Sequence, residues 1–63
     1  MEKRSLSIAG HRTSLALEPE FWAGLSAMAE AQGTTLPLLI QSIDEARKTA
    51  NLSSAVRLAV LAW

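Results

Sequence analysis

The 63-residue chain contains no cysteine, and this absence excludes several ways of stabilising a small domain. Without cysteine the chain can form neither a disulfide nor a thiolate metal site, and a single histidine cannot build a structural zinc site. A chain of this length buries only about 60% of its unfolded surface when it folds alone. Oligomerisation is therefore the means of stabilisation that the composition leaves.

The chain also lacks a long apolar run. No stretch approaches the roughly 20 residues that a membrane helix needs, and too few apolar residues follow the charged residues 1–4 for a signal peptide. We expect no membrane association and, because the absence of cysteine is compatible with a reducing compartment, a cytoplasmic location. No internal repeat is apparent. The apolar pattern still runs at Trp63, which leaves room for a natural chain that continues past it.

The net charge is zero, but the charges are unevenly distributed. Residues 1–17 hold three cations, Lys3, Arg4 and Arg12, against one acidic residue, Glu2, a net of +2. Residues 18–63 hold three cations against five acidic residues, a net of −2. The N-terminal segment is thus the basic part, and a dimer would double its charge if the two segments lay side by side.

The strongest local pattern predicts one strand followed by a helix. Residues 11–17 alternate, with Leu15 and Leu17 toward a core, and residues 19–32 form an apolar stripe of helical period that opens on Pro19 and closes at Gly33. Leu6 and Ile8 have the opposite parity, so we expect Gly10 to mark a bulge or bend and residues 1–5 to be mobile. With one strand and no partner for it, the chain requires a second copy, which predicts a homodimer.

Two further helices complete the expected domain, which spans residues 1–63 as a single unit. The first covers residues 36–50 and is capped by Thr35, with Pro37 tolerated in its first turn. The second covers residues 54–63 and is nearly free of charge, so it must be buried against the domain or a partner. The apolar stripes give an expected dimer core of Leu15, Leu17, Phe21, Trp22, Leu25, Leu39, Ile40 and Ile43.

The outward residues of the predicted strand, Arg12, Ser14 and Ala16, are the first candidate site. Arginine can pair with guanine and serine can donate or accept a hydrogen bond in the major groove, whereas alanine offers only contact with a thymine methyl. An ordinary solvated strand face is the alternative interpretation.

Two groups of residues are candidates for phosphate contacts. Lys3, Arg4 and His11 could form a basic arm, or a merely solubilising terminus. Residues Thr34, Thr35 and Leu36 open a helix, where free N–H groups favour anions, although an ordinary helix cap is the interpretation that the sequence alone favours.

Nothing in the sequence supports catalysis. No glycine-rich phosphate loop, metal cluster or catalytic triad is present, and Ser53 and Ser54 have no nearby base and are explained as helix caps. We therefore expect no enzyme activity, no cofactor and no metal. Trp22 and Trp63 fall within apolar stripes and are expected in a core or interface rather than stacked on bases.

The order of these motifs resembles the ribbon-helix-helix superfamily of bacterial DNA-binding proteins. The resemblance rests on segments 10–14, 17–22, 43–44 and 51–58 and covers about residues 4–62, with closest similarity to a small uncharacterised subfamily. It implies a mainly α fold with one β-strand and an intertwined homodimer with an intermolecular two-stranded antiparallel ribbon, here with an additional C-terminal helix. It also implies base contacts from Arg12, Ser14 and Ala16 and phosphate contacts at Thr34 to Leu36.

Two functions follow as hypotheses. The first is a homodimeric regulator of transcription that reads double-stranded DNA with its ribbon. The second is a protein-interaction or antitoxin-like adaptor dimer that has lost DNA readout. The neutral net charge, Ala16, Pro37 and an apolar last helix that could recruit another protein or dimer favour the second.

Overall fold

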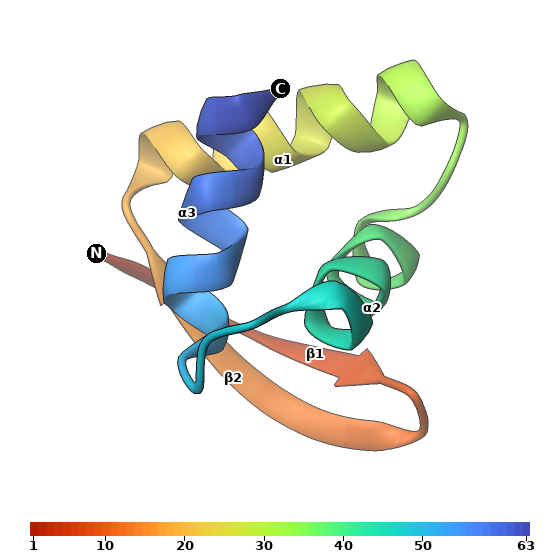
Figure 1. Cartoon of the computed structure of the whole chain (residues 1–63), viewed down its shortest axis with the longest axis vertical. Coiled ribbons are helices and arrows are strands. Elements are labelled where there is room, and N and C mark those ends of the chain that lie inside the picture. The colour runs from red at the N-terminus through yellow and green to blue at the C-terminus, as the bar shows by residue number, and fades with distance from the viewer.

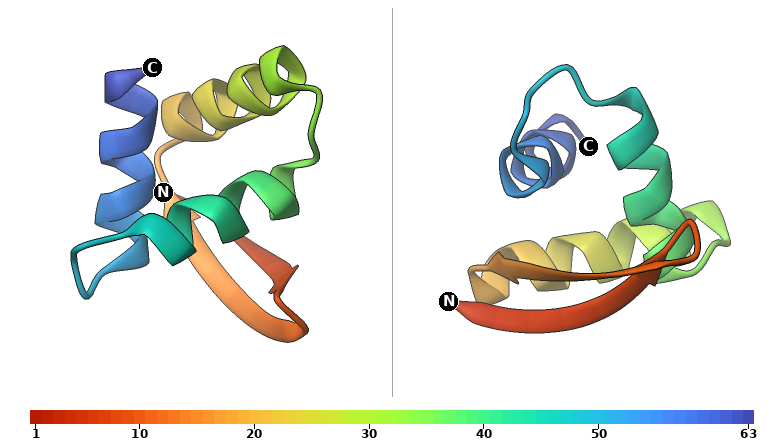
Figure 2. Two further views of the ribbon diagram at one scale, coloured as in Figure 1. Left: turned by 45° about the vertical axis from the view of Figure 1, so that its right-hand side comes forward. Right: turned by 90° about the horizontal axis from the view of Figure 1, so that it is seen from below.

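A two-stranded antiparallel hairpin lies against three helices in the computed structural model, which describes residues 1–63 (Figure 1). Further views show all the helices on one side of the hairpin, with the other side open (Figure 2). In chain order the elements are β1 (Glu2–Ile8), β2 (His11–Leu17), α1 (Pro19–Gln32), α2 (Leu36–Ala46) and α3 (Leu52–Ala62).

The hairpin corrects the prediction of a single strand. β1 pairs with β2 along its whole length, from Glu2 opposite Leu17 to Ile8 opposite His11. The expectation that residues 1–5 are mobile is wrong for Glu2 to Ser5, which lie in β1. Because β2 has its partner within the chain, the argument that an unpaired strand requires a second copy does not hold.

The change of parity at Gly10 reflects a tight turn rather than a bulge. Ala9 and Gly10 join the strands, and both have positive φ, 53° and 81°. Positive φ at both central residues is the feature of the type I′ turn, whose twist matches that of the strands it joins. Glycine adopts this conformation freely, whereas alanine is strained in it. The strain at Ala9 is therefore local to the turn that holds β1 beside β2.

Local signals explain the two ends of α1. Pro19 begins the helix, where its missing N–H costs nothing. Gly33 ends it in the left-handed conformation with φ 66°, and the Thr34 N–H donates to the Ala29 carbonyl at 2.9 Å. These caps direct the chain from α1 into α2 within three residues.

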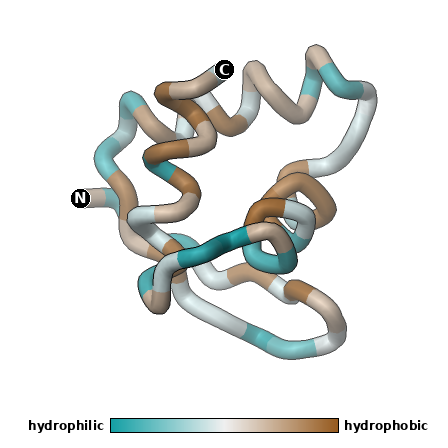
Figure 3. The backbone as a smooth tube through the Cα atoms, viewed as in Figure 1, coloured by the Kyte–Doolittle hydropathy of each residue, from teal (hydrophilic) through white to brown (hydrophobic).

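The other helices differ from expectation at their ends. α2 stops at Ala46 rather than near residue 50, because Arg47 is extended and its Nη1 donates to the carbonyls of Thr49 and Ala50. α3 begins at Leu52 rather than residue 54, because the Asn51 side chain accepts the Ser54 N–H and is the cap. The loop between them is a strongly hydrophilic stretch of the chain (Figure 3).

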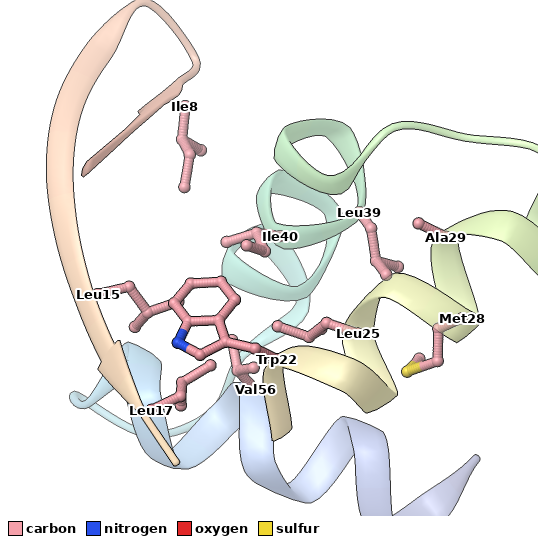
Figure 4. Packing of buried hydrophobic residues seen from close by; sticks show 10 residues of the cluster. All are labelled: Ile8, Leu15, Leu17, Trp22, Leu25, Met28, Ala29, Leu39, Ile40 and Val56. Atoms are coloured by element: carbon pink, nitrogen blue, oxygen red, sulfur yellow. The ribbon is translucent and has the colours of Figure 1, made fainter. Parts of the chain in front are cut away.

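The core lies between the inner face of the hairpin and the helices (Figure 4). Six of the residues expected in a dimer core are buried within one chain, and Phe21 and Ile43 pack against them half-buried. The core also includes residues that were not in the expected set, from β1, α1 and α3. The buried cluster consists of Ile8, Leu15, Leu17, Trp22, Leu25, Met28, Ala29, Leu39, Ile40 and Val56.

Helix α3 is only partly buried. Val56 is fully enclosed, and α3 approaches α1 so closely at Gly24 that an added Cβ would lie 2.6 Å from Val60 Cγ1. Trp63, expected in a core or interface, is 60% exposed and does not enter the core, and Leu61 is 73% exposed. The inner side of α3 is therefore fixed to the domain and its outer side is bare.

An ion pair also connects α3 to the start of α1. Arg57 Nε lies 2.9 Å from Glu18 Oε1, and the arginine stands over the Phe21 ring at 5.9 Å from its centroid. The hydrogen bond from Arg57 lowers the pKa of the Glu18 carboxyl from its ordinary value of 4.5. The pair lies at the surface, so it orients the two helices more than it stabilises them.

Candidate nucleic-acid interface

The open side of the hairpin gathers polar side chains from both strands. Because side chains alternate along a strand, the register places the even residues of β2 beside the odd residues of β1. All are exposed except Ala16, which is half-buried. We call this surface the ribbon face; it consists of Lys3, Ser5, Ser7, Arg12, Ser14 and Ala16.

The ribbon face carries positive charge and no acidic residue. Lys3 lies opposite Ala16, and Arg12 lies opposite Ser7, so the two cations occupy diagonal corners. They are separated by four residues, or about 13 Å, along the ribbon. Ser5 and Ser14 pair directly between them and supply hydroxyl donors and acceptors. The sequence pattern identified the β2 half of this surface and missed the β1 half, except for Lys3.

Arg4 lies on the opposite side of β1 from Lys3. Its guanidinium stands 4.5 Å from the centroid of the Trp22 ring, and its Nε pairs with Glu2 Oε2 at 2.5 Å. The Trp22 Nε1–H in turn donates to the Glu2 carbonyl at 2.8 Å. Arg4 therefore helps to attach β1 to the core and is not part of the cationic ribbon face.

His11 lies at the turn end of β2, opposite Ile8, and is exposed. It borders a shallow pocket that also includes Asp44 and Arg47, which pair with each other at 2.7 Å. His11 is thus near the hairpin tip, but its alternation places it on the inner side of the strand.

The start of α2 offers few free N–H groups. Pro37 has none, the Leu38 N–H donates to Thr35 Oγ1 at 3.3 Å, and the Leu39 N–H donates to the Thr35 carbonyl at 2.9 Å. Thr34 is half-buried and its N–H is used in the cap of α1. The N–H groups of Thr35 and Leu36 form no hydrogen bond within the chain, so any anion contact here rests on these two.

A second exposed surface is apolar. Leu58, Leu61 and Trp63 are each more than half exposed on the outer side of α3. Beside them, a groove of about 380 Å³ runs between α2 and α3 and is lined by Ile43, Ala46, Ala55 and Ala59 among others. This surface has no counterpart on the two strands of the hairpin, where no large apolar side chain is exposed.

No group of three or more histidine, cysteine or acidic side chains comes together in a way that could hold a metal ion. No buried polar side chain lacks a hydrogen-bond partner. None of the helices is long and apolar enough to cross a membrane.

The fold is a polar antiparallel ribbon backed by helices. This architecture defines a class of domain, because a two-stranded ribbon is one of the elements that proteins present to nucleic acid. Within that class the chain belongs to the ribbon-helix-helix family, because the family model described as "Ribbon-helix-helix domain" matches residues 1–63. Such domains are in general DNA-binding regulators or antitoxin-type proteins. Neither a curated protein nor a solved structure matches the chain.

Proposed function

We propose that this protein is a transcriptional regulator that binds double-stranded DNA by laying its ribbon face in the major groove. The observation that carries the proposal is the composition of that face: two cations, three serines and an alanine, with no acidic residue. The core seals the opposite side of the hairpin, so a ligand of the ribbon can approach only from the ribbon face.

The dimensions of the ribbon suit this ligand. The major groove is about 12 Å wide and admits a two-stranded ribbon, whose strands are about 4.8 Å apart. Arg12 is the residue best suited to pair with a guanine edge, and Ser14 is suited to either a donor or an acceptor. Ala16 can contact only a thymine methyl, so specificity rests on the other residues of the face.

Phosphate contacts would fix the ribbon in the groove. Lys3 is the exposed cation at the far corner of the ribbon face, and the Thr35 and Leu36 N–H groups are free at the start of α2. Because Pro37 removes one donor and the cap uses another, we assign this helix start a weaker contribution than the ribbon cations. His11 near the hairpin tip is a further candidate, whereas Arg4 is engaged with Trp22.

We propose further that the DNA-bound form is a homodimer in the bacterial cytoplasm. Family membership supports this assembly, as does the small core of the single chain, in which 11 of 63 residues are buried. Two intact hairpins would present four ribbon cations to one DNA site, and a ribbon made of two β2 strands would present two, the Arg12 of each copy. Dimeric ribbon proteins commonly match their two-fold axis to a pseudo-palindromic operator.

The test is a fluorescence-anisotropy titration against a random-sequence DNA pool at about 50 and 200 mM salt. If each ribbon cation neutralises one phosphate, a ribbon surface with two cations gives a logarithmic salt slope of about −1.8 and one with four cations about −3.6. The affinity should then fall about 12-fold for two cations, or about 150-fold for four, across that fourfold change in salt.

The matched variants are Arg12→Ala and Lys48→Ala. Each removes one exposed cation, but Lys48 lies in the loop between α2 and α3, away from the ribbon face. Arg12→Ala should weaken binding by about 1–3 kcal/mol and relax base preference at one position per half-site, and Lys48→Ala should not. Equal losses in the two variants would mean that net charge, not the ribbon, drives binding.

The exposed apolar surface of α3 supports a second candidate function, an antitoxin-like or adaptor dimer that binds another protein. Leu61 in α3 and Trp63 directly after it are the most exposed large apolar side chains of this surface. Exposed apolar surface that lies together is a common mark of a protein-interaction site. Absence of DNA binding at the lower salt would favour this function over DNA recognition.

A further inference from the structure

The two strands of the hairpin are near-copies of each other in sequence. Five of the seven residues of β1 match in character the β2 residue nine positions later. Lys3 and Arg12 are cations, Ser5 and Ser14 are identical, and so are Leu6 and Leu15. The small residues Ser7 and Ala16 correspond, as do the aliphatic residues Ile8 and Leu17. Two pairs differ in kind, Glu2 with His11 and Arg4 with Thr13. The chain therefore contains a short repeat, contrary to the expectation from its sequence.

The register makes the repeat symmetrical. Lys3 pairs with Ala16, and the corresponding residues Arg12 and Ser7 pair with each other, while Ser5 pairs with Ser14 at the centre. A rotation by half a turn about that central pair therefore carries each strand onto its near-copy. Two β2 strands from two copies of the chain, paired antiparallel about Ser14, would place the same residue types at the same positions.

The same correspondence holds on the inner side of the hairpin. Ile8 is 6% exposed and Leu17 is fully buried, and Leu6 packs against the core beside Leu15. A second copy's β2 in the place of β1 would bring Leu17 to the position of Ile8 and Leu15 to that of Leu6. The pairing length and the apolar contacts of the ribbon would both be kept.

The attachments of β1 and β2 to the rest of the chain are unequal. β2 continues directly into α1 and supplies two core leucines. β1 is connected to the helices only through β2, across the strained turn at Ala9. Ile8 lies in the core and Leu6 packs against it, while Trp22 contacts the Glu2 carbonyl and Arg4 at the other end of the strand. Release of β1 would break these contacts but would leave the chain from β2 to α3 connected, and a second copy's β2 could replace the apolar ones.

We infer that β1 is an internal substitute for a second copy's β2, so that β2 exchanges between two partners: β1 in the monomer and β2 of a second copy in an intertwined dimer. The inference rests on the proposed homodimer for its second state. It adds that the chain carries its own competitor for dimerisation, so that protein concentration sets which pairing prevails. The ribbon face keeps its character in both states.

Engineered cysteines test the exchange, because the natural chain has none. Residues directly opposite in an antiparallel pair have Cα atoms about 4.5–5.5 Å apart, which suits a disulfide. In a glutathione redox buffer, Ser14→Cys should form an intermolecular disulfide, because position 14 of both copies lies at the axis of the proposed dimer. Ser5→Cys is the matched control on the same face, and it should cross-link far less because β1 does not pair with its own copy.

The double variant S5C/S14C separates exchange from simple addition of one hairpin to another. Its intramolecular disulfide locks β1 to β2, so the oxidised protein should remain monomeric in sedimentation at concentrations at which the wild type and the reduced variant dimerise. Circular dichroism verifies that both forms are folded. An oxidised variant that dimerises like the reduced one overturns the exchange, and so does a wild type that stays monomeric up to about 1 mM.

DNA binding is measured separately on the wild type, because the engineered cysteines lie on the ribbon face. If dimerisation follows the lock but the wild type does not bind DNA, the exchange stands and the proposed function fails. If the wild type binds DNA and neither the lock nor concentration alters the oligomeric state, the function stands and the exchange fails. The two proposals are therefore distinguished by one set of proteins.

Discussion

The two faces of the hairpin share one backbone and have opposite properties. The inner face holds Leu15 and Leu17, which are 3% and 0% exposed, while the neighbouring residue Ser14 on the ribbon face is exposed. The two faces differ only because successive side chains of a strand point to opposite sides. The comparison teaches that a single strand can define the core and the candidate DNA surface at once, because each property depends on a different set of residues.

The largest effect on stability is expected from a charge on the inner face, and it tests whether the two faces have separate roles. Leu17→Asp would bury a carboxylate without a partner in the fully enclosed core, and we expect a loss of at least about 4 kcal/mol in the free energy of unfolding. Ser14→Asp adds the same charge on the ribbon face and should change stability by no more than about 0.5 kcal/mol. Urea denaturation followed by circular dichroism measures both. Similar losses in the two variants would refute the separation of the faces.

A smaller effect concerns the tie between the inner face and the end of β1. Trp22→Phe removes the hydrogen bond to the Glu2 carbonyl and part of a buried ring, and we expect a loss of about 2 kcal/mol. Trp63→Phe is the control, because that side chain is 60% exposed, and it should be neutral. Protection of the β1 amides from hydrogen exchange should fall in the first variant only. Unchanged protection would mean that Trp22 does not hold β1.

The turn that joins the two strands permits a change in the favourable direction. Asparagine tolerates positive φ better than alanine, so Ala9→Asn should raise the free energy of unfolding by about 0.5–1 kcal/mol. Gly10→Ala should lower it by about 1 kcal/mol, because φ is 81° there. Thermal unfolding at matched concentration gives the comparison. A stabilising effect of Gly10→Ala would show that the turn has another conformation in solution.

The smallest expected effect is on the acid side of the pH profile. Because the hydrogen bond from Arg57 lowers the pKa of Glu18, its contribution to stability is fully present above the ordinary value of 4.5 and is lost as the pH falls through the lower folded-state pKa. Glu18→Gln should therefore flatten the fall of the melting temperature below pH 4.5. Glu30→Gln, which removes a carboxylate without an ion pair, is the control. If the melting temperatures of wild type and Glu18→Gln fell identically below pH 4.5, the Arg57–Glu18 pair would not contribute to stability.

Local signals in the sequence are sufficient for part of this fold. The alternation in β2, the proline at the start of α1 and the left-handed glycine at its end each act over a few residues, and the corresponding features are present in the structure. The end of α2 was misjudged because the Arg47 side chain satisfies the carbonyls of the following loop, which makes the extended backbone favourable. No local pattern reports that interaction.

The second strand was missed for a different reason. Leu6 and Ile8 alternate as Leu15 and Leu17 do, but Ala9 and Gly10 are not the Asn-Gly pair that usually announces a two-residue hairpin turn. The spacing of two alternating runs by two residues was the signal available. The β1 half of the candidate site was missed with it, because Ser5 and Ser7 join the ribbon face only through the register.

The near-symmetry of the hairpin also bears on how recognition can evolve. In a ribbon made of two identical strands, every substitution is present twice, and the preferred DNA site must remain palindromic. In the hairpin the two halves are encoded at separate positions, so a change at Lys3 alters one half and leaves Arg12 as it was. The two strands of one hairpin can therefore diverge one residue at a time, whereas the two-fold axis of a homodimer would still repeat each change in the other copy.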